Sequence, residues 1–360
     1  MVGILYFTGN LPIQPIINIL NPSSSPTPSN ASPSLAPTAT LSSSPTPTPT
    51  LPPSPVISNS QIRIGDGEYL ITSALTLNNV ENVSITLDPN ARLYRDAVGF
   101  NLIFVNASKN IEISGGIFDG VMDDTTESKD TYNSCSIKVL NSVNVTISNA
   151  KLFNASDDAI WIEDSNQTFI LDNNIETFYK HAMTIYSTGR QLTNSFTIRN
   201  NTVNANYHEI FDGITVFAKS ATNGLIINNT ARNLYNPAFS VDQSGIHIED
   251  YDDYPQSTTV LVTENSVFDC KFGITSATAN NVQVTNNTVT NCTRGIFLWY
   301  PIGNVIVNNT LNNCLTDIYT VGGSNNTITG NIVNNFEIGL SPSPFLSDDH
   351  KRIDNAFQSS

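Results

Sequence analysis

The sequence predicts an all-β solenoid of the parallel β-helix type, and three observations support that prediction. The chain of 360 residues is only 13% charged and is rich in Asn, Thr, Ser, Val and Ile, which suits strands and tight turns. Its second half repeats with a period of 22 residues. Each period holds several short runs of alternating apolar residues and no helical pattern. Leucine-rich repeats are excluded because the chain lacks the Leu-x-x-Leu-x-Leu pattern.

The repeat is clearest in four segments, ENSVFDC, NNTVTNC, NNTLNNC and GNIVNNF, which begin at Glu264, Asn286, Asn308 and Gly330. Earlier coils follow the same order of strands and are lengthened by insertions. One coil alone has no closed core, so stacking at about 4.8 Å per coil must bury an inner column of Ile, Val and Leu. Cys270, Cys292 and Cys314 share one register, and we expect a column of buried thiols there rather than a disulfide.

Composition divides the chain into four parts. Residues 1–20 are apolar but interrupted by polar residues and proline, and no Lys or Arg precedes Arg63, so we expect an atypical export or anchor segment. Residues 21–60 are almost wholly Pro, Ser, Thr and Ala and predict an extended stalk. The β-helix is expected over 61–345 and a C-terminal tail over 346–360.

The net charge and the N-glycosylation sequons indicate which partners and which location to expect for the protein. The formal net charge of −15 repels a phosphate backbone, which excludes nucleic acid and leaves glycans, cations and cell-surface partners. Many Asn-x-Ser/Thr acceptors fit a glycosylated protein that is extracellular or at the cell surface, although Asn-Asn-Thr also makes turns and stacked Asn ladders. The acceptors are Asn30, Asn82, Asn106, Asn144, Asn154, Asn166, Asn200, Asn228, Asn286, Asn291, Asn308 and Asn325.

One strand of each coil predicts an outward-facing surface. If the first apolar residue of the strand, such as Ile160 or Ile246, points into the core, alternation turns its neighbours outward. The entry row, two positions earlier, is then Asp158, His181, Asp212, Ser244, Phe272, Arg294 and Thr316. The first outer row is Trp161, Thr184, Thr215, His247, Thr275, Phe297 and Tyr319. The second outer row is Glu163, Tyr186, Phe217, Glu249, Ala277, Trp299 and Val321.

Aromatic rings in these rows can stack on sugars, and the carboxylates can accept hydroxyl hydrogen bonds. The candidate substrate-binding residues are Trp161, Glu163, Tyr186, Phe217, His247, Glu249, Phe297 and Trp299. Ordinary solvated strand surface is the alternative. Two acidic insertions, beginning at Phe118 and Glu249, can wall a groove beside this face. Bound Ca²⁺ is conceivable in them, a solvated loop is the competing interpretation, and no other metal or cofactor is expected.

With these residues in view, the chain resembles the pectin lyase-like right-handed β-helix superfamily, and within it the polygalacturonases of glycoside hydrolase family 28. The segments IGDGEYLITSALTLNNVENVSITLDPNARL and ISGGIFDG carry the likeness, which extends roughly over Gln61 to Phe345. The resemblance implies that Asp157 is a general acid, that Asp158 helps to activate water, and that His181 is the family's histidine.

The chain departs from the polygalacturonase motifs at several positions. Lys180 and Ala182 replace the glycines around His181, and Cys135 stands where a third Asp belongs. Thr215 and Phe217 stand where an Arg and a Lys hold the uronate carboxylate. A galacturonate substrate is therefore not implied.

A physical alternative is an inverting hydrolase of neutral sugars. Asp158 and Asp212 lie two coils apart, which predicts roughly 9 to 10 Å between their strands. Inverting glycosidases separate their carboxyl groups by about 6.5 to 9.5 Å. The catalytic candidates are then Asp157, Asp158, His181 and Asp212.

Two other functions stay open. A polysaccharide lyase ranks below a hydrolase because the two outer rows contain no Arg or Lys. The non-enzymatic alternative is a glycosylated surface or adhesive β-helix, displayed on the stalk, that binds glycans or a partner.

Overall fold

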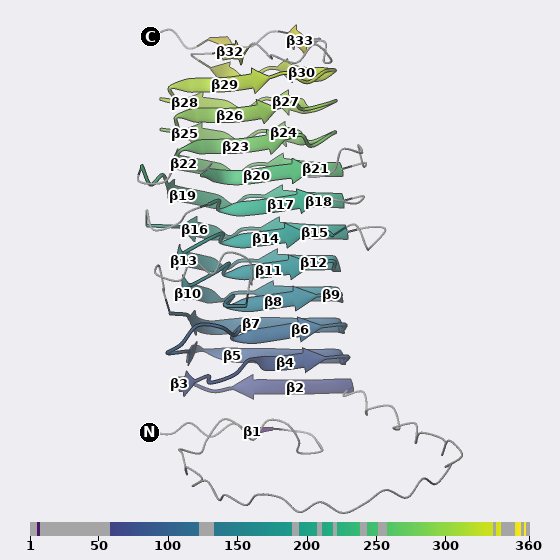
Figure 1. Cartoon of the computed structure of the whole chain (residues 1–360), viewed down its shortest axis with the longest axis vertical. Coiled ribbons are helices and arrows are strands. Elements are labelled where there is room, and N and C mark those ends of the chain that lie inside the picture. The colour runs from purple at the N-terminus through teal and green to yellow at the C-terminus, as the bar shows by residue number, and fades with distance from the viewer. Residues whose placement is uncertain are drawn as a thin grey trace, which may run out of the picture.

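The computed structural model describes residues 6–7, 58–121, 133–188, 194–206, 211–218, 222–237, 243–250, 258–333, 336–339, 350–353 and 356–357. Over these residues the regular structure is entirely β, arranged as a tall stack of coils (Figure 1). Within the same ranges, no helix has the length and hydropathy of a membrane span. The predicted export segment and most of the stalk lie outside the described residues.

One face of the stack is an 11-stranded parallel sheet with one strand from each coil. Its strands are β4 (Leu75–Asn78), β6 (Ile103–Asn106), β8 (Ile137–Leu140), β11 (Ile160–Glu163), β14 (Met183–Tyr186), β17 (Ile214–Ala218), β20 (Ser244–Asp250), β23 (Phe272–Ala277), β26 (Arg294–Trp299), β29 (Thr316–Val321) and β32 (Phe336–Gly339). Their outer face is called the site face below.

The remaining strands form a 23-stranded sheet whose pairing separates into two ladders. The first ladder is β2 (Ser58–Ile64), β5 (Glu81–Tyr94), β7 (Lys109–Asp119), β9 (Val143–Ser148), β12 (Asn166–Leu171), β15 (Asn194–Arg199), β18 (Thr222–Ile227), β21 (Thr258–Thr263), β24 (Gln283–Thr285), β27 (Val305–Val307), β30 (Asn326–Thr329) and β33 (His350–Ile353). The second is β3 (Gly67–Leu70), the ends of β5 and β7, β10 (Lys151–Ala155), β13 (Asn174–Phe178), β16 (Thr202–Asn204), β19 (Thr230–Leu234), β22 (Ser266–Cys270), β25 (Thr288–Thr290), β28 (Thr310–Asn312), β31 (Ile332–Val333) and β34 (Ala356–Phe357). At the N-terminal end, β1 (Tyr6–Phe7) pairs antiparallel with β2.

The chain is therefore a right-handed parallel β-helix, as the sequence predicted. Val262, Val284, Ile306 and Ile328 pair in succession, which confirms the 22-residue coil of the C-terminal half. Strands β33 and β34 pair with β30 and β31, so coil pairing continues beyond residue 345.

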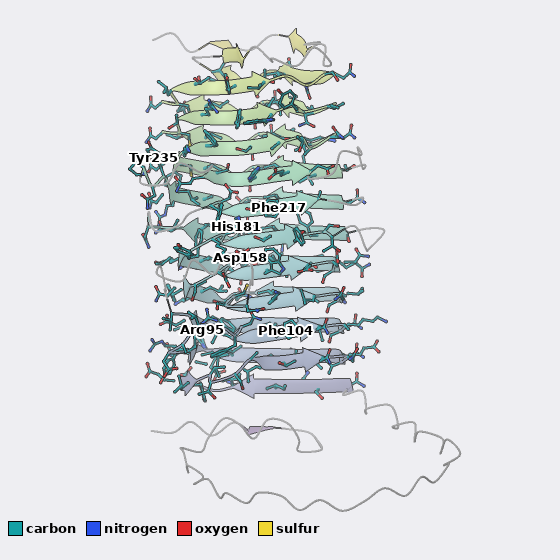
Figure 2. All side chains as sticks on the ribbon, viewed as in Figure 1. Arg95, Phe104, Asp158, His181, Phe217 and Tyr235 are labelled. Carbon is teal, nitrogen blue, oxygen red and sulfur yellow. The ribbon has the colours of Figure 1, made fainter. Side chains whose placement is uncertain are left out.

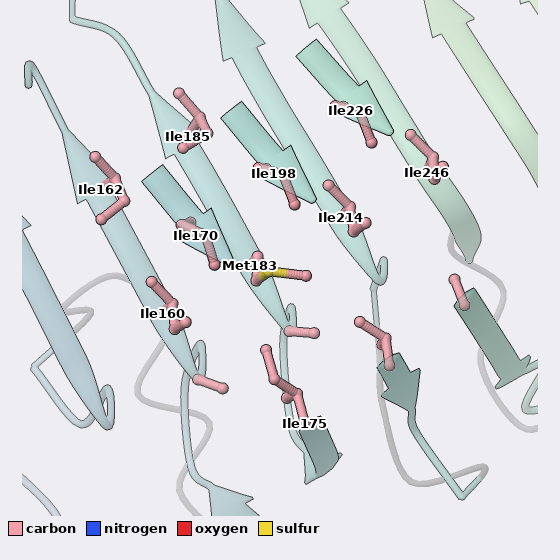
Figure 3. Close-up of a cluster of buried hydrophobic side chains, with 14 of the residues drawn as sticks. Ile160, Ile162, Ile170, Ile175, Met183, Ile185, Ile198, Ile214, Ile226 and Ile246 are labelled. Atoms are coloured by element: carbon pink, nitrogen blue, oxygen red, sulfur yellow. The ribbon is translucent and has the colours of Figure 1, made fainter. Parts of the chain in front are cut away.

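The core is a set of stacked aliphatic columns (Figure 3). Ile160, Met183 and Ile214 follow one another on the 11-stranded sheet, and Ile170 and Ile198 do so on the first ladder. All five side chains are fully buried. Because each buried aliphatic side chain contributes about 1.5 to 3 kcal/mol, stacking is what stabilises coils that have no closed core of their own.

A column of asparagine amides holds the turn between the two ladders. In seven successive coils this turn is two residues long, and its second residue is a buried Asn: Asn173, Asn201, Asn229, Asn265, Asn287, Asn309 and Asn331. Asn201, for example, donates from Nδ2 to Asn229 Oδ1 and to two backbone carbonyls.

The residue before each buried Asn has a positive φ, as at Asn228, where φ is 53°. Asn adopts this left-handed conformation more readily than most residues. The recurring Asn-Asn-Thr is therefore a turn motif, which accounts structurally for the sequons that begin at Asn200, Asn228, Asn286 and Asn308.

The thiol column is confirmed. Cys270, Cys292 and Cys314 are buried and free, and each Sγ donates to the backbone carbonyl two residues earlier. They behave as small apolar core residues.

Candidate functional site

Strand register brings the predicted outer rows together on the site face. Thr184, Thr215 and His247 pair in succession, as do Tyr186, Phe217 and Glu249. Figure 2 shows Asp158, His181 and Phe217 on successive coils. Lys138 extends the first outer row by one coil, with Nζ 5.9 Å from the Trp161 ring centre. The predicted positions of the two outer rows hold no Arg or Lys, and the structure adds Lys138 one coil before them.

Asp157 is held in a buried ion pair. Lys180 Nζ lies 2.9 Å from Asp157 Oδ1, and the backbone N–H of Ser134 donates to Asp157 Oδ2 at 2.8 Å. Lys180 replaces the glycine that precedes the family's histidine. Both carboxylate oxygens of Asp157 therefore have a nitrogen donor within hydrogen-bond distance.

Asp158 positions a histidine. It is 0% exposed, its Oδ1 lies 3.1 Å from His181 Nδ1, and its Oδ2 accepts a hydrogen bond from the Thr184 hydroxyl. The His181 ring stacks on Phe211 and meets the edge of Phe217, with ring centres 5.2 and 5.7 Å away. A carboxylate on Nδ1 fixes the tautomer and leaves Nε2 as the other functional nitrogen.

A second carboxylate–imidazole pair lies farther along the face. Asp212 Oδ2 is 2.8 Å from His247 Nδ1, and Asp212 Oδ1 accepts the backbone N–H of Ser244 at 2.7 Å. Burial raises the pKa of Asp212, but the charge and hydrogen bond of His247, the charge of His181 and the Ser244 amide outweigh it, so the pKa is lowered. Asp212 therefore stays ionised beside His247.

His247 also faces the carboxylate of Glu249, with Nε2 3.7 Å from Oε2. Asp212, His247 and Glu249 thus form a series that leads from a buried carboxylate to a partly exposed one. The sequence placed Asp212 and His247 in different groups because they lie in different rows. The sequence did contain a signal for this contact. Asp212 directly precedes β17, and His247 lies on β20, the equivalent strand of the next coil.

Asp158 and Asp212 each belong to a separate carboxylate–imidazole pair. Both oxygens of Asp158 are taken by His181 and Thr184, and both oxygens of Asp212 by Ser244 and His247. Both carboxylates are buried. Each carboxylate therefore orients one imidazole.

Cys135 is fully buried where the family has a third carboxylate. Burial, followed by the charges of Asp158 and Asp157, raises its pKa well above the usual value. A neutral thiol therefore stands at this position.

The aromatic residues differ sharply in exposure. Trp161 is 3% exposed and donates from Nε1 to Glu163 Oε2 at 3.0 Å, with the Tyr186 ring centre 5.3 Å away. Phe297 is also buried, whereas Trp299 is 45% exposed. The interpretation of Trp161 and Phe297 as open stacking platforms is wrong, because side chains of neighbouring coils cover them. Trp299 is the exposed platform.

An arginine lies among aromatic rings at the C-terminal end of the site face. The guanidinium carbon of Arg294 lies 5.2, 4.6 and 4.2 Å from the ring centres of Phe272, Phe297 and Tyr319. Trp299 contacts Phe297 edge-on at 5.8 Å. The site face therefore has an acidic, histidine-containing part and a separate part with arginine and aromatic rings.

Comparison with solved structures shows the same fold. The mannuronan C-5 epimerase AlgE6 A-module of Azotobacter vinelandii matches with a TM-score of 0.58 and 14% identity, over 83% of this chain and 91% of that one. An exopolygalacturonase from Thermotoga maritima matches at 0.55 and 11%, over 79% and 84%. PfbA, a surface adhesin of Streptococcus pneumoniae, matches at 0.50 and 13%, over 75% and 82%. No curated protein matches the sequence significantly.

The family model described as "Periplasmic copper-binding protein (NosD)" matches residues 177–360. Within the described ranges, no three His, Cys, Asp or Glu side chains are grouped to hold a metal ion. Hydrogen bonding from Cys270 raises the pKa of Cys292 well above its usual value, and burial adds to this, against the lowering effect of a hydrogen bond from Cys314. The acidic insertions considered for Ca²⁺ lie largely outside the described residues. The family match nevertheless spans more than half of the chain, and this protein belongs to the NosD family.

Proposed function

We propose that this protein binds an extended polysaccharide along the site face, outside the cytoplasm. One observation carries the proposal: the second outer row holds Glu163, Tyr186, Phe217 and Glu249 on four successive coils and, after Ala277, Trp299. Coils repeat about every 4.8 Å, so a chain molecule laid along the axis meets a new set of side chains at each step. The similar epimerase, exopolygalacturonase and adhesin lend support through their titles.

Glycoside hydrolysis is the reaction that we propose for this face. Hydrolysis needs one group that donates a proton to the glycosidic oxygen and another that accepts a proton from water. We assign these two roles to two groups on the site face. One is Glu249 together with His247, and the other is His181. Asp158 and Asp212 act as positioning residues for the two imidazoles, and Asp157 stays paired with Lys180.

Binding without cleavage is the second candidate. The ion pair between Lys180 and Asp157 favours it, because Asp157 matches the carboxyl group that serves as general acid in polygalacturonases and is here engaged by a lysine. In this case the protein is a surface β-helix of the adhesive type. Exposed turn residues such as Asn286 and Asn308 are the positions at which we propose N-glycosylation, should the chain pass through a glycosylating compartment.

A panel of polysaccharides tests both candidates through binding and through release of reducing sugar. Hydrolysis predicts that His247→Ala and Glu249→Gln abolish release from a bound polymer. The control Glu112→Gln, which removes an exposed carboxylate on the first ladder, should leave release unchanged. Binding with no release by the parent protein selects the second candidate, and no binding to any polymer contradicts the proposal.

A further inference from the structure

We propose that Arg294 and Trp299 form a binding site for an anionic sugar unit, with the guanidinium taking a carboxylate or sulfate group and the indole taking the sugar ring. The inference rests on the proposed polysaccharide binding and deepens it, because it names the charge class of the ligand. The site lies on β26 and its two neighbouring coils, apart from the acidic part of the face.

Aromatic rings hold the guanidinium in place without using its hydrogen-bond donors. Arg294 lies against Phe272, Phe297 and Tyr319, which come from three successive coils. The rings of Phe297 and Tyr319 are nearly parallel, with 5.6 Å between centres and 22° between planes. A guanidinium packed against ring faces keeps its in-plane N–H groups, which match the geometry of a planar oxyanion.

Those donors have no acceptor in the part of the chain that the structure describes. There, Arg294 has neither an ion pair nor a side-chain hydrogen bond, whereas Arg63 pairs with Asp88 at 2.9 Å and Arg92 pairs with Asp119 at 2.7 Å. Arg294 is also only half-buried, so a ligand can reach it. The guanidinium is thus ordered by its surroundings and still able to donate.

Local charge favours an anion at this end of the face. Arg294 is the charged side chain at the outward positions of β23, β26 and β29, and the one carboxylate of these strands, Asp317, is fully buried. Lys271 adds a second cation, with Nζ 5.4 Å from the Phe272 ring centre. The net charge of −15 acts weakly here, because charges are screened beyond about 8 Å at physiological ionic strength.

Trp299 supplies the other half of the recognition. It lies on the same strand as Arg294, is 45% exposed, and is braced edge-on by Phe297. The Trp299 ring and the Arg294 guanidinium both contact the Phe297 ring, so a ligand that extends along this strand can meet an apolar platform and a cation. A neutral sugar would use the ring and leave the guanidinium without a partner.

The test measures affinity of the full chain for three polymers by isothermal titration calorimetry: polygalacturonate, dextran sulfate and neutral dextran. We expect at least one anionic polymer to bind more tightly than dextran. Arg294→Gln should weaken that binding by about tenfold or more, since a charge-assisted bidentate contact is lost. Arg294→Lys keeps the charge but loses the planar fork, and should also weaken it.

The matched control is Arg199→Gln, which removes one positive charge from an exposed position on the first ladder. It should change affinity by less than about twofold, because it removes only a distant, screened charge. Trp299→Ala should weaken binding of every polymer that the parent binds. Circular dichroism of each variant verifies the fold, and the order of affinities between polygalacturonate and dextran sulfate shows whether carboxylate or sulfate is preferred.

Three results would overturn the inference. Equal losses in Arg294→Gln and Arg199→Gln would mean that only overall charge matters. Dextran binding as tight as that of both anionic polymers, unaffected by Arg294→Gln, would remove the anionic site and leave the proposed polysaccharide binding intact. Failure of both anionic polymers to bind would also refute the site, while binding of a neutral glycan from the wider panel would still support the proposed function.

Discussion

Lys180 Nζ lies 2.9 Å from Asp157 Oδ1, and both side chains are about nine-tenths buried. The two residues come from successive coils, so the ion pair ties one coil to the next just before strands β11 and β14 begin. It also neutralises a carboxylate that would otherwise be buried beside Asp158. This contact explains why a lysine can stand where the resembling family has a glycine.

Lys180→Met should destabilise the protein by about 3 to 5 kcal/mol, because it leaves Asp157 buried without its cation. Lys180→Met combined with Asp157→Asn should recover much of that loss, since no uncompensated charge remains. Urea unfolding of the two single variants and the double variant measures the coupling. Additive effects would mean that the ion pair contributes nothing at this site.

Asp212 should give the protein a pH-dependent stability. Its pKa in the folded state is lowered, so its contribution is fully present above the unfolded value of about 3.9 and is lost as pH falls through the folded pKa. Asp212→Asn should therefore be less stable than the parent at pH 7, with the difference shrinking below about pH 4. Urea midpoints between pH 3 and 7 measure this, and a constant difference across the range would contradict it.

Asn287 tests the amide column. Its Nδ2 donates to the carbonyls of Val262 and Thr285 and to Asn309 Oδ1, and its own Oδ1 accepts from Asn265. Asn287→Ala leaves several buried groups without partners and should cost about 2 to 4 kcal/mol. Thr288→Ala, at the exposed neighbouring position, should cost less than about 1 kcal/mol. Similar losses in the two variants would argue against the column.

Substitution of the two tryptophans should have different effects on the stability of the protein. Trp161→Ala empties a buried position and should destabilise by about 3 to 5 kcal/mol, whereas Trp299→Ala should change stability by less than about 1 kcal/mol. Acrylamide should quench the fluorescence of Trp299 in the native protein and that of Trp161 only weakly. Equal quenching in the two single-tryptophan variants would contradict the difference in burial.

The thiols should be inert in the native state. All four cysteines are buried, and burial or neighbouring groups raise the pKa of Cys135, Cys292 and Cys314, so few thiolates are exposed to reagent. Ellman's reagent should label almost none of them at pH 8 and four after unfolding in guanidinium. Rapid labelling of the native protein would show an accessible thiol.

Periodicity was enough to predict the scaffold. The register of Val262, Val284 and Ile306 in the sequence is the register of the strands, because a one-residue slip would turn every core side chain outward. The same alternation correctly placed His247 and Trp299 on the outer face. These features depend on the repeat alone.

Contacts between coils could not be predicted in the same way. Trp161 faces outward yet is covered by Tyr186 and Lys138, which belong to the coils on either side. The pairing of His247 with Asp212 also crosses from one coil to the next and from one row to another. Such contacts depend on side-chain length and direction, which a row-by-row reading of the sequence does not contain.

The two-residue asparagine turn means that the β-helix can be lengthened or shortened only by whole coils. Because each amide in the column bonds to its neighbours in the next coils, a residue added to this turn would break the column, and in the sequence the insertions come before or after strands of the 11-stranded sheet instead. Excision of residues 287–308 would join Asn286 to Asn309 and restore an uninterrupted column in a shorter rod, whereas excision of one residue fewer would not. Related proteins with this fold can lengthen or shorten the ligand-facing surface coil by coil. They can also alter the bordering loops without changing the amide column and the aliphatic core that stabilise the stack.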